Sequence, residues 1–149
     1  MTKLTELLSK AGRRETEPLG FGRGGKRTER TPDILLIGRI NEGDLSTLDT
    51  ERTPVDAFLL EMGEVDAKVL VSATKALQGD LWGVRAKTVT VDGVRSLKES
   101  GADFILFAAP NTPASVLSEE DMGAFLIVAP DLDDEEAQAV HGLPIDGVA

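Results

Sequence analysis

Residues 81–108 read LWGVRAKTVTVDGVRSLKESGADFILFA and contain the clearest structural signal in the chain. An apolar strand candidate at 81–87 precedes a helix candidate at 91–100, which ends before Gly101. A second apolar run at 104–108 follows that glycine. Glycine just past a helix is a common stop signal, and two strands joined by one helix form a right-handed parallel crossover. The stretch therefore predicts one complete βαβ unit.

The same spacing extends over most of the sequence. Segments 64–78 and 133–140 are predicted to be helical, 113–121 is a short helix or turn, and 41–54 holds one or two helical turns. Strand candidates recur at intervals of 21 to 24 residues, beginning near Ile34, Ala57, Leu81, Asp103, Ala124 and Ile145. Strands that alternate with helices at this spacing predict a parallel α/β fold, with strands at 34–37, 58–60, 81–85, 104–107 and 125–128.

Two parallel architectures fit six such units. The length of 149 residues favours an open doubly wound sheet, since an eight-stranded barrel typically needs about 250. Even spacing, short strands and charged residues on one alternation phase favour a barrel: if Phe58 and Trp82 face the helices, Glu61 and Arg85 face the other way. We expect an incomplete (β/α)8-type barrel of about six units, with the open sheet as the alternative.

Two regions differ in character. Residues 1–32 are predicted to form a short amphipathic helix, with Thr2 as N-cap, and a flexible, basic, glycine-rich arm. The glycine-rich run at 20–25 lacks the preceding strand and following helix of phosphate-binding motifs. Residues 33–149 form the βα-repeat domain. Because the chain stops inside a strand candidate at 145–149, we expect a domain that is truncated there or covered by a partner, hence a homo-oligomer.

Composition narrows the possible functions. The net charge is −10, and residues 1–30 hold 8 of the 16 Lys and Arg but only 4 of the 26 Asp and Glu. The remaining acidic surface argues against nucleic-acid binding. Cysteine is absent, which excludes disulfides and thiolate metal sites, and with one histidine no metal or cofactor is predicted. No apolar run approaches the roughly 20 residues of a membrane span, so we expect a cytoplasmic protein with no membrane partner.

Charged and amide side chains lie where the predicted strands end. Ligands of parallel α/β folds bind at this carboxyl edge, so these side chains are candidates for a ligand site. The candidate catalytic residues are Glu61, as proton acceptor, and Lys87, as Schiff-base amine or general acid. The candidate substrate-binding residues are Arg39, Arg85 and Asn111.

These residues support two functional hypotheses. In the first, the protein is a TIM-barrel-like lyase or isomerase that acts on a small anionic metabolite, with Arg39 and Arg85 holding the anion. In the second, it is a non-catalytic binding or assembly module, and Arg39, Glu61 and Arg85 form a structural layer of ion pairs. A pocket lined by these side chains would favour the first hypothesis, and complete pairing without a cavity would favour the second.

Overall fold

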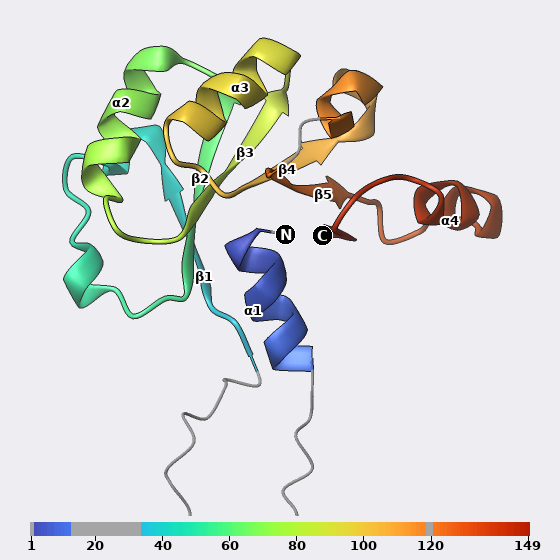
Figure 1. The fold of residues 1–149 in the computed structure, drawn as a ribbon, viewed down its shortest axis with the longest axis horizontal. Helices are drawn as coiled ribbons and strands as arrows, with labels where there is room; N and C mark the ends of the chain where they lie inside the picture. The colour runs from blue at the N-terminus through green and yellow to red at the C-terminus, as the bar shows by residue number, and fades with distance from the viewer. Residues whose placement is uncertain (1, 13–33, 119–120) are drawn as a thin grey trace, which may run out of the picture.

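The computed structural model describes residues 2–12, 34–118 and 121–149 (Figure 1). Within these residues there are six strands, four α-helices and four short 3-10 helices. The strands are β1 (Ile37–Asn41), β2 (Ala57–Glu64), β3 (Trp82–Thr88), β4 (Phe104–Ala108), β5 (Gly123–Ile127) and β6 (Gly147–Val148). The α-helices are α1 (Lys3–Gly12), α2 (Ala67–Ala76), α3 (Val91–Glu99) and α4 (Asp134–His141). The 3-10 helices are η1 (Glu42–Asp44), η2 (Thr50–Arg52), η3 (Ala109–Asn111) and η4 (Ala114–Ser118).

All six strands pair in parallel, in the order β1-β2-β3-β4-β5-β6. The predicted parallel α/β class is confirmed. The order runs without a reversal, so the sheet has no switch point of the doubly wound kind. The sheet is not closed, because β1 and β6 each pair with a single neighbour among the described strands.

The βαβ unit at the centre of the sequence forms as predicted. Thr90 caps α3, its hydroxyl accepting a hydrogen bond from the Gly93 N–H. The helix ends before Gly101, whose φ of 87° is a left-handed conformation that glycine adopts without strain. Strands β3 and β4 therefore lie side by side, with Val84 opposite Ile105.

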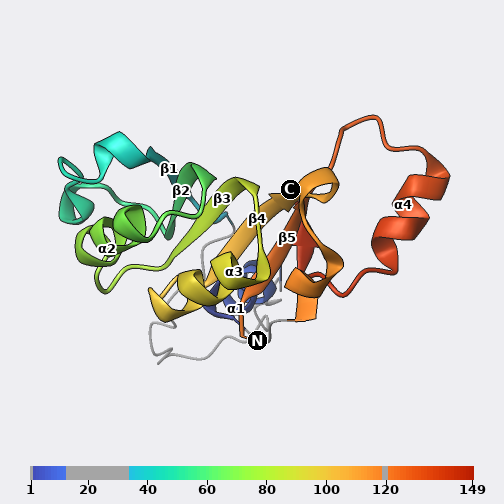
Figure 2. The same ribbon diagram turned by 90° about the horizontal axis from the view of Figure 1, so that it is seen from above.

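Helices α2 and α3 cover one face of the sheet (Figures 1 and 2). Their stripes, which include Leu70, Ala73, Val94 and Leu97, pack on a single buried cluster. From the sheet, that cluster takes alternate positions of the strands: Phe58, Leu60, Trp82, Val84, Ile105, Phe107, Ala124 and Leu126. We call this side the outer face, and the opposite side the inner face. The alternation predicted for Phe58 and Trp82 is confirmed.

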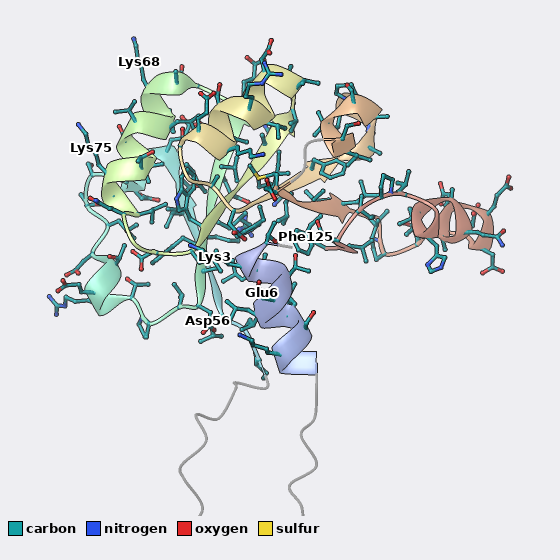
Figure 3. All side chains as sticks on the ribbon, viewed as in Figure 1. Lys3, Glu6, Asp56, Lys68, Lys75 and Phe125 are labelled. Atoms are coloured by element: carbon teal, nitrogen blue, oxygen red, sulfur yellow. The ribbon has the colours of Figure 1, made fainter. Side chains whose placement is uncertain are left out.

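Helix α1 packs on the inner face (Figures 1 and 2). Leu4 is 2% exposed and joins a second cluster with Ala57, Leu59, Phe104 and Phe125. Figure 3 shows Phe125 beside the N-terminal end of α1. The Asp103 carboxylate accepts hydrogen bonds from the N–H groups of Lys3 and Leu4, at 3.1 and 3.0 Å. A side chain that precedes β4 thus satisfies two amide donors that the helix itself leaves unpaired.

The predicted first strand, 34–37, is wrong in position. Strand β1 begins at Ile37, opposite Ala57, and extends to Asn41, opposite Glu61. Ile34 and Leu36 precede it and are 73% and 56% exposed. Most of the apolar run therefore lies before the paired segment, because pairing begins opposite Ala57, the first residue of β2; the Leu36 carbonyl accepts hydrogen bonds from the N–H groups of Asp56 and Ala57. The other predicted strands agree with β2 to β5 within a few residues at each end.

Several large apolar side chains remain exposed. On and before β1 these are Ile34, Leu36 and Ile37, and at the other edge Val148 is 56% exposed. Helix α4 extends beyond the β5 and β6 end of the sheet and has no buried residue (Figures 1 and 2). Among the described residues, no helix combines the length and hydropathy needed to cross a bilayer.

Candidate functional site

One row of paired residues crosses the inner face and passes through the middle of β2 to β5. It consists of Asn41, Glu61, Arg85, Leu106, Phe125 and Gly147, each opposite the next on the neighbouring strand. Glu61 and Leu106 lie two positions beyond Leu59 and Phe104, and Phe125 is itself a member of the inner cluster, so the period of the strands places the row on the same face. The row is polar on β1 to β3 and apolar on β4 to β6.

A pocket of about 740 Å³ opens beside this row. Its volume lies within the range of small-molecule sites. Polar and charged lining residues come from β1, η1, β2 and β3, whereas Ala108 and Ile127 come from β4 and β5. The lining residues are Asn41, Glu42, Gly43, Glu61, Met62, Gly63, Arg85, Ala86, Lys87, Ala108 and Ile127.

Glu61 is held between two arginines. Its Oε1 and Oε2 each lie 2.8 Å from Arg39 Nη2, and its Oε1 lies 3.0 Å from Arg85 Nη1. The side chain of Glu61 is 24% exposed, against 64% for Arg39 and 45% for Arg85. The two arginine side chains are thus open to solvent. Ion pairs between exposed side chains contribute little to the free energy of unfolding.

The arginines stabilise Glu61 as a carboxylate. The hydrogen bond from Arg39 is the largest cause that holds the pKa of Glu61 below its ordinary value, and Arg85 lowers it further. Partial burial acts in the opposite direction and is outweighed. In return, the Glu61 carboxylate raises the pKa of the Arg39 guanidinium. A carboxylate held this way is a weak proton acceptor at neutral pH.

Lys87 occupies a different position from the arginines. It lies on β3 two residues after Arg85, is exposed, and lines the pocket. No ion pair joins it to any of the described residues. Its ammonium is therefore available to a ligand in a way that the guanidinium of Arg39 is not.

The structure brings together most of the predicted site residues. Glu61, Arg85 and Lys87 all line the pocket, and Arg39 reaches it only through Glu61. Asn111 is the last residue of η3, after β4, and its side chain lies outside what the structure describes. The ion-pair layer and the pocket, expected as alternatives, occur together.

Sequence reasoning missed the apolar wall of the pocket. Ala108 and Ile127 are partners across β4 and β5 and lie on the same alternation phase as Leu106 and Phe125. The charged residues mark this phase on β1 to β3, whereas β4 and β5 carry no charged residue that would mark it in the sequence.

The described side chains do not form a recognisable metal-ion site. Within the described ranges, no group of three histidine, aspartate or glutamate side chains is arranged to hold an ion. His141 is the last residue of α4 and is exposed there. Comparisons with protein-family models, curated proteins and solved structures found no significant match to the chain.

Proposed function

We propose that the protein binds a small anionic metabolite in the pocket at the carboxyl ends of β1 to β5. The observation that carries this proposal is the position of Lys87, an exposed cation that lines the pocket and has no ion-pair partner among the described residues. Arg85 lies on the same strand and shares its guanidinium between Glu61 and the pocket. Two cations on one strand offer charge-assisted hydrogen bonds to a carboxylate or a phosphate.

The reaction class that we propose is a lyase or isomerase step, in which a proton moves at a carbon next to a carbonyl. Such a step needs an acceptor for the proton that leaves the carbon and a group that donates a proton to the carbonyl oxygen. Glu61 is held as a carboxylate by Arg39 and Arg85, which suits it to positioning Arg85 rather than to accepting a proton. We therefore assign Lys87 the role of general acid: its ammonium donates a proton to the carbonyl oxygen of the substrate while the proton on the adjacent carbon passes to water, and Arg39 acts only through Glu61.

A non-catalytic module is the second candidate. It is favoured by the pairing of both Glu61 oxygens, which gives Arg39 and Arg85 a structural role that needs no ligand. In this alternative, the sheet is an incomplete barrel whose open edges at β1 and β6 meet further copies of the chain. The exposed apolar residues Leu36 and Val148 lie at those edges and support such an assembly.

Calorimetric titration with acetate, pyruvate and inorganic phosphate tests the binding proposal. We expect Lys87→Met to weaken binding of these anions about tenfold, as for the loss of one hydrogen bond to a charged group. Lys75→Met is the matched control, because Lys75 points away from the sheet into solvent (Figure 3). Equal affinities of the two variants for every anion would contradict the proposal.

Exchange of solvent deuterium into the methyl group of pyruvate separates the enzyme from the module. An enzyme of the proposed class exchanges these protons, and Lys87→Met loses the exchange while Lys75→Met keeps it. Binding of the anions without any exchange would instead support the non-catalytic candidate.

A further inference from the structure

The inner-face row beside the pocket divides into a polar half and an apolar half. Along the inner-face row, Asn41, Glu61 and Arg85 are followed by Leu106 and Phe125 on the next two strands. The change occurs between β3 and β4, where Arg85 is directly opposite Leu106. A ligand that spans this boundary meets hydrogen-bonding groups at one end and hydrocarbon at the other.

The apolar side reaches into the pocket itself. Ala108 and Ile127 are neighbours across β4 and β5, both are partly buried, and both line the pocket. No described charged side chain of β4 or β5 lines it. A ligand with hydroxyl groups along its body would lose hydrogen bonds to water on this side without replacing them, which is costly.

The net charge of the pocket and of Arg39 beside it is complementary to a ligand with a single negative charge. Among the described lining residues, Glu42 and Glu61 balance Arg85 and Lys87. Arg39, bound to Glu61 from outside the pocket, adds one positive charge. One anionic group would neutralise this excess, whereas a phosphate dianion would leave a negative charge close to Glu42 and Glu61.

We propose that the ligand is a monocarboxylate with a short aliphatic chain. Its carboxylate binds Lys87 and Arg85, and its chain lies along Ala108 and Ile127. This inference rests on the proposed function, since it specifies the ligand of the same pocket. It excludes sugar phosphates and polyhydroxylated acids as preferred ligands.

Calorimetric titration of the full chain with four probes tests the proposal. Acetate and hexanoate share a head group and differ by four methylene groups. Gluconate keeps the single charge but carries hydroxyl groups along its chain, and inorganic phosphate supplies a second charge. We expect hexanoate to bind at least tenfold more tightly than each of the other three, from partial burial of its chain.

Two variants locate the chain of the ligand. Ile127→Thr makes the apolar wall more polar and is expected to reduce the preference for hexanoate over acetate about threefold or more. Val128→Thr is the matched control, since Val128 is the next residue on the chain, is also partly buried, and packs against the outer-face cluster. This control should keep the preference of the unmodified protein.

The outcomes separate the inference from the proposed function. If acetate, gluconate or phosphate binds as tightly as hexanoate and Lys87→Met weakens that binding, the pocket takes anions and the inference is overturned. The inference is also overturned if Ile127→Thr and Val128→Thr have equal preferences. If none of the four probes binds, or if Lys87→Met binds all of them like the unmodified protein, the proposed function fails too.

Discussion

Glu61 is the residue that joins the polar half of the inner face. Its carboxylate bridges Arg39 on β1 and Arg85 on β3. Side-chain ion pairs therefore connect these three adjacent strands in addition to their backbone hydrogen bonds. Because the folded protein lowers the pKa of Glu61, the carboxylate contributes stability above its ordinary pKa of about 4.5. That contribution is lost as the pH falls through the lowered value of the folded state.

Glu61→Gln should therefore destabilise the protein at pH 7 by a small amount, of the order of an exposed ion pair. The deficit relative to the unmodified protein should shrink at pH 3, as Glu61 becomes protonated in the unfolded and then the folded protein. Urea denaturation at the two pH values measures this difference. Glu64→Gln, on the same strand but without an ion pair to the described residues, is the control. A deficit that is equal at both pH values would contradict the assignment.

Gly83 is required for packing rather than for chain flexibility. A Cβ at this position would clash with the backbone oxygen of Phe104 and lie 2.5 Å from its ring, which is buried in the inner cluster. We expect Gly83→Ala to lower the free energy of unfolding by about 1–3 kcal/mol through overpacking. Gly63→Ala, where a Cβ would meet nothing within 4 Å, should change it little. Thermal denaturation of the two variants is the measurement, and similar midpoints would show that Phe104 moves aside.

At the scale of elements, the sequence predicted the central units best. In β2 to β5 and α3, the period of the apolar residues agrees with the residues that begin and end each element. Thr90, for example, caps the start of α3, and Gly101 follows its end. Local signals and tertiary packing favour the same structure there. For β1 they disagree: the most apolar stretch ends where pairing starts, at Ile37 opposite Ala57, and only the partner strand determines this register.

The candidate site was predictable in part for the same reason. Strand alternation placed Glu61, Arg85 and Lys87 on one face, because the period of two is a local property of a strand. The pairing of Glu61 with two arginines depends on rotamers and register, which the sequence does not contain. The pocket wall of Ala108 and Ile127 depends on the register between β4 and β5, which the sequence does not contain either.

Asp103 attaches α1 to the sheet, and its removal should loosen that helix. Asp103→Ala leaves the N–H groups of Lys3 and Leu4 without their acceptor, a loss of about 1 kcal/mol. Amides of α1 should then exchange with solvent deuterium about fivefold faster, while those of α3 remain unchanged. Asp80→Ala is the control, because Asp80 precedes β3 but its carboxylate caps no helix in the described structure. Unchanged exchange in α1 would show that Leu4 alone holds the helix.

At the scale of the whole molecule, the open sheet leaves backbone groups of β1 and β6 without a second strand among the described residues. We expect the protein to associate with itself at micromolar concentration, since Ile34, Leu36 and Val148 are exposed beside these edges. Sedimentation velocity should detect a dimer or larger species. Leu36→Lys should shift it towards the monomer, and Val71→Lys, on the solvent side of α2, should not. A compact monomer for the unmodified chain would contradict association through the edges.

Binding at the carboxyl ends of the strands is the central claim, and a nitrogen–proton correlation spectrum recorded during titration with hexanoate tests it most directly. The pocket described here predicts saturable shifts of the amides of Gly63, Lys87, Ala108 and Ile127, with those of α4 unchanged. Absence of shifts, or shifts confined to α4 or to α1, would contradict it.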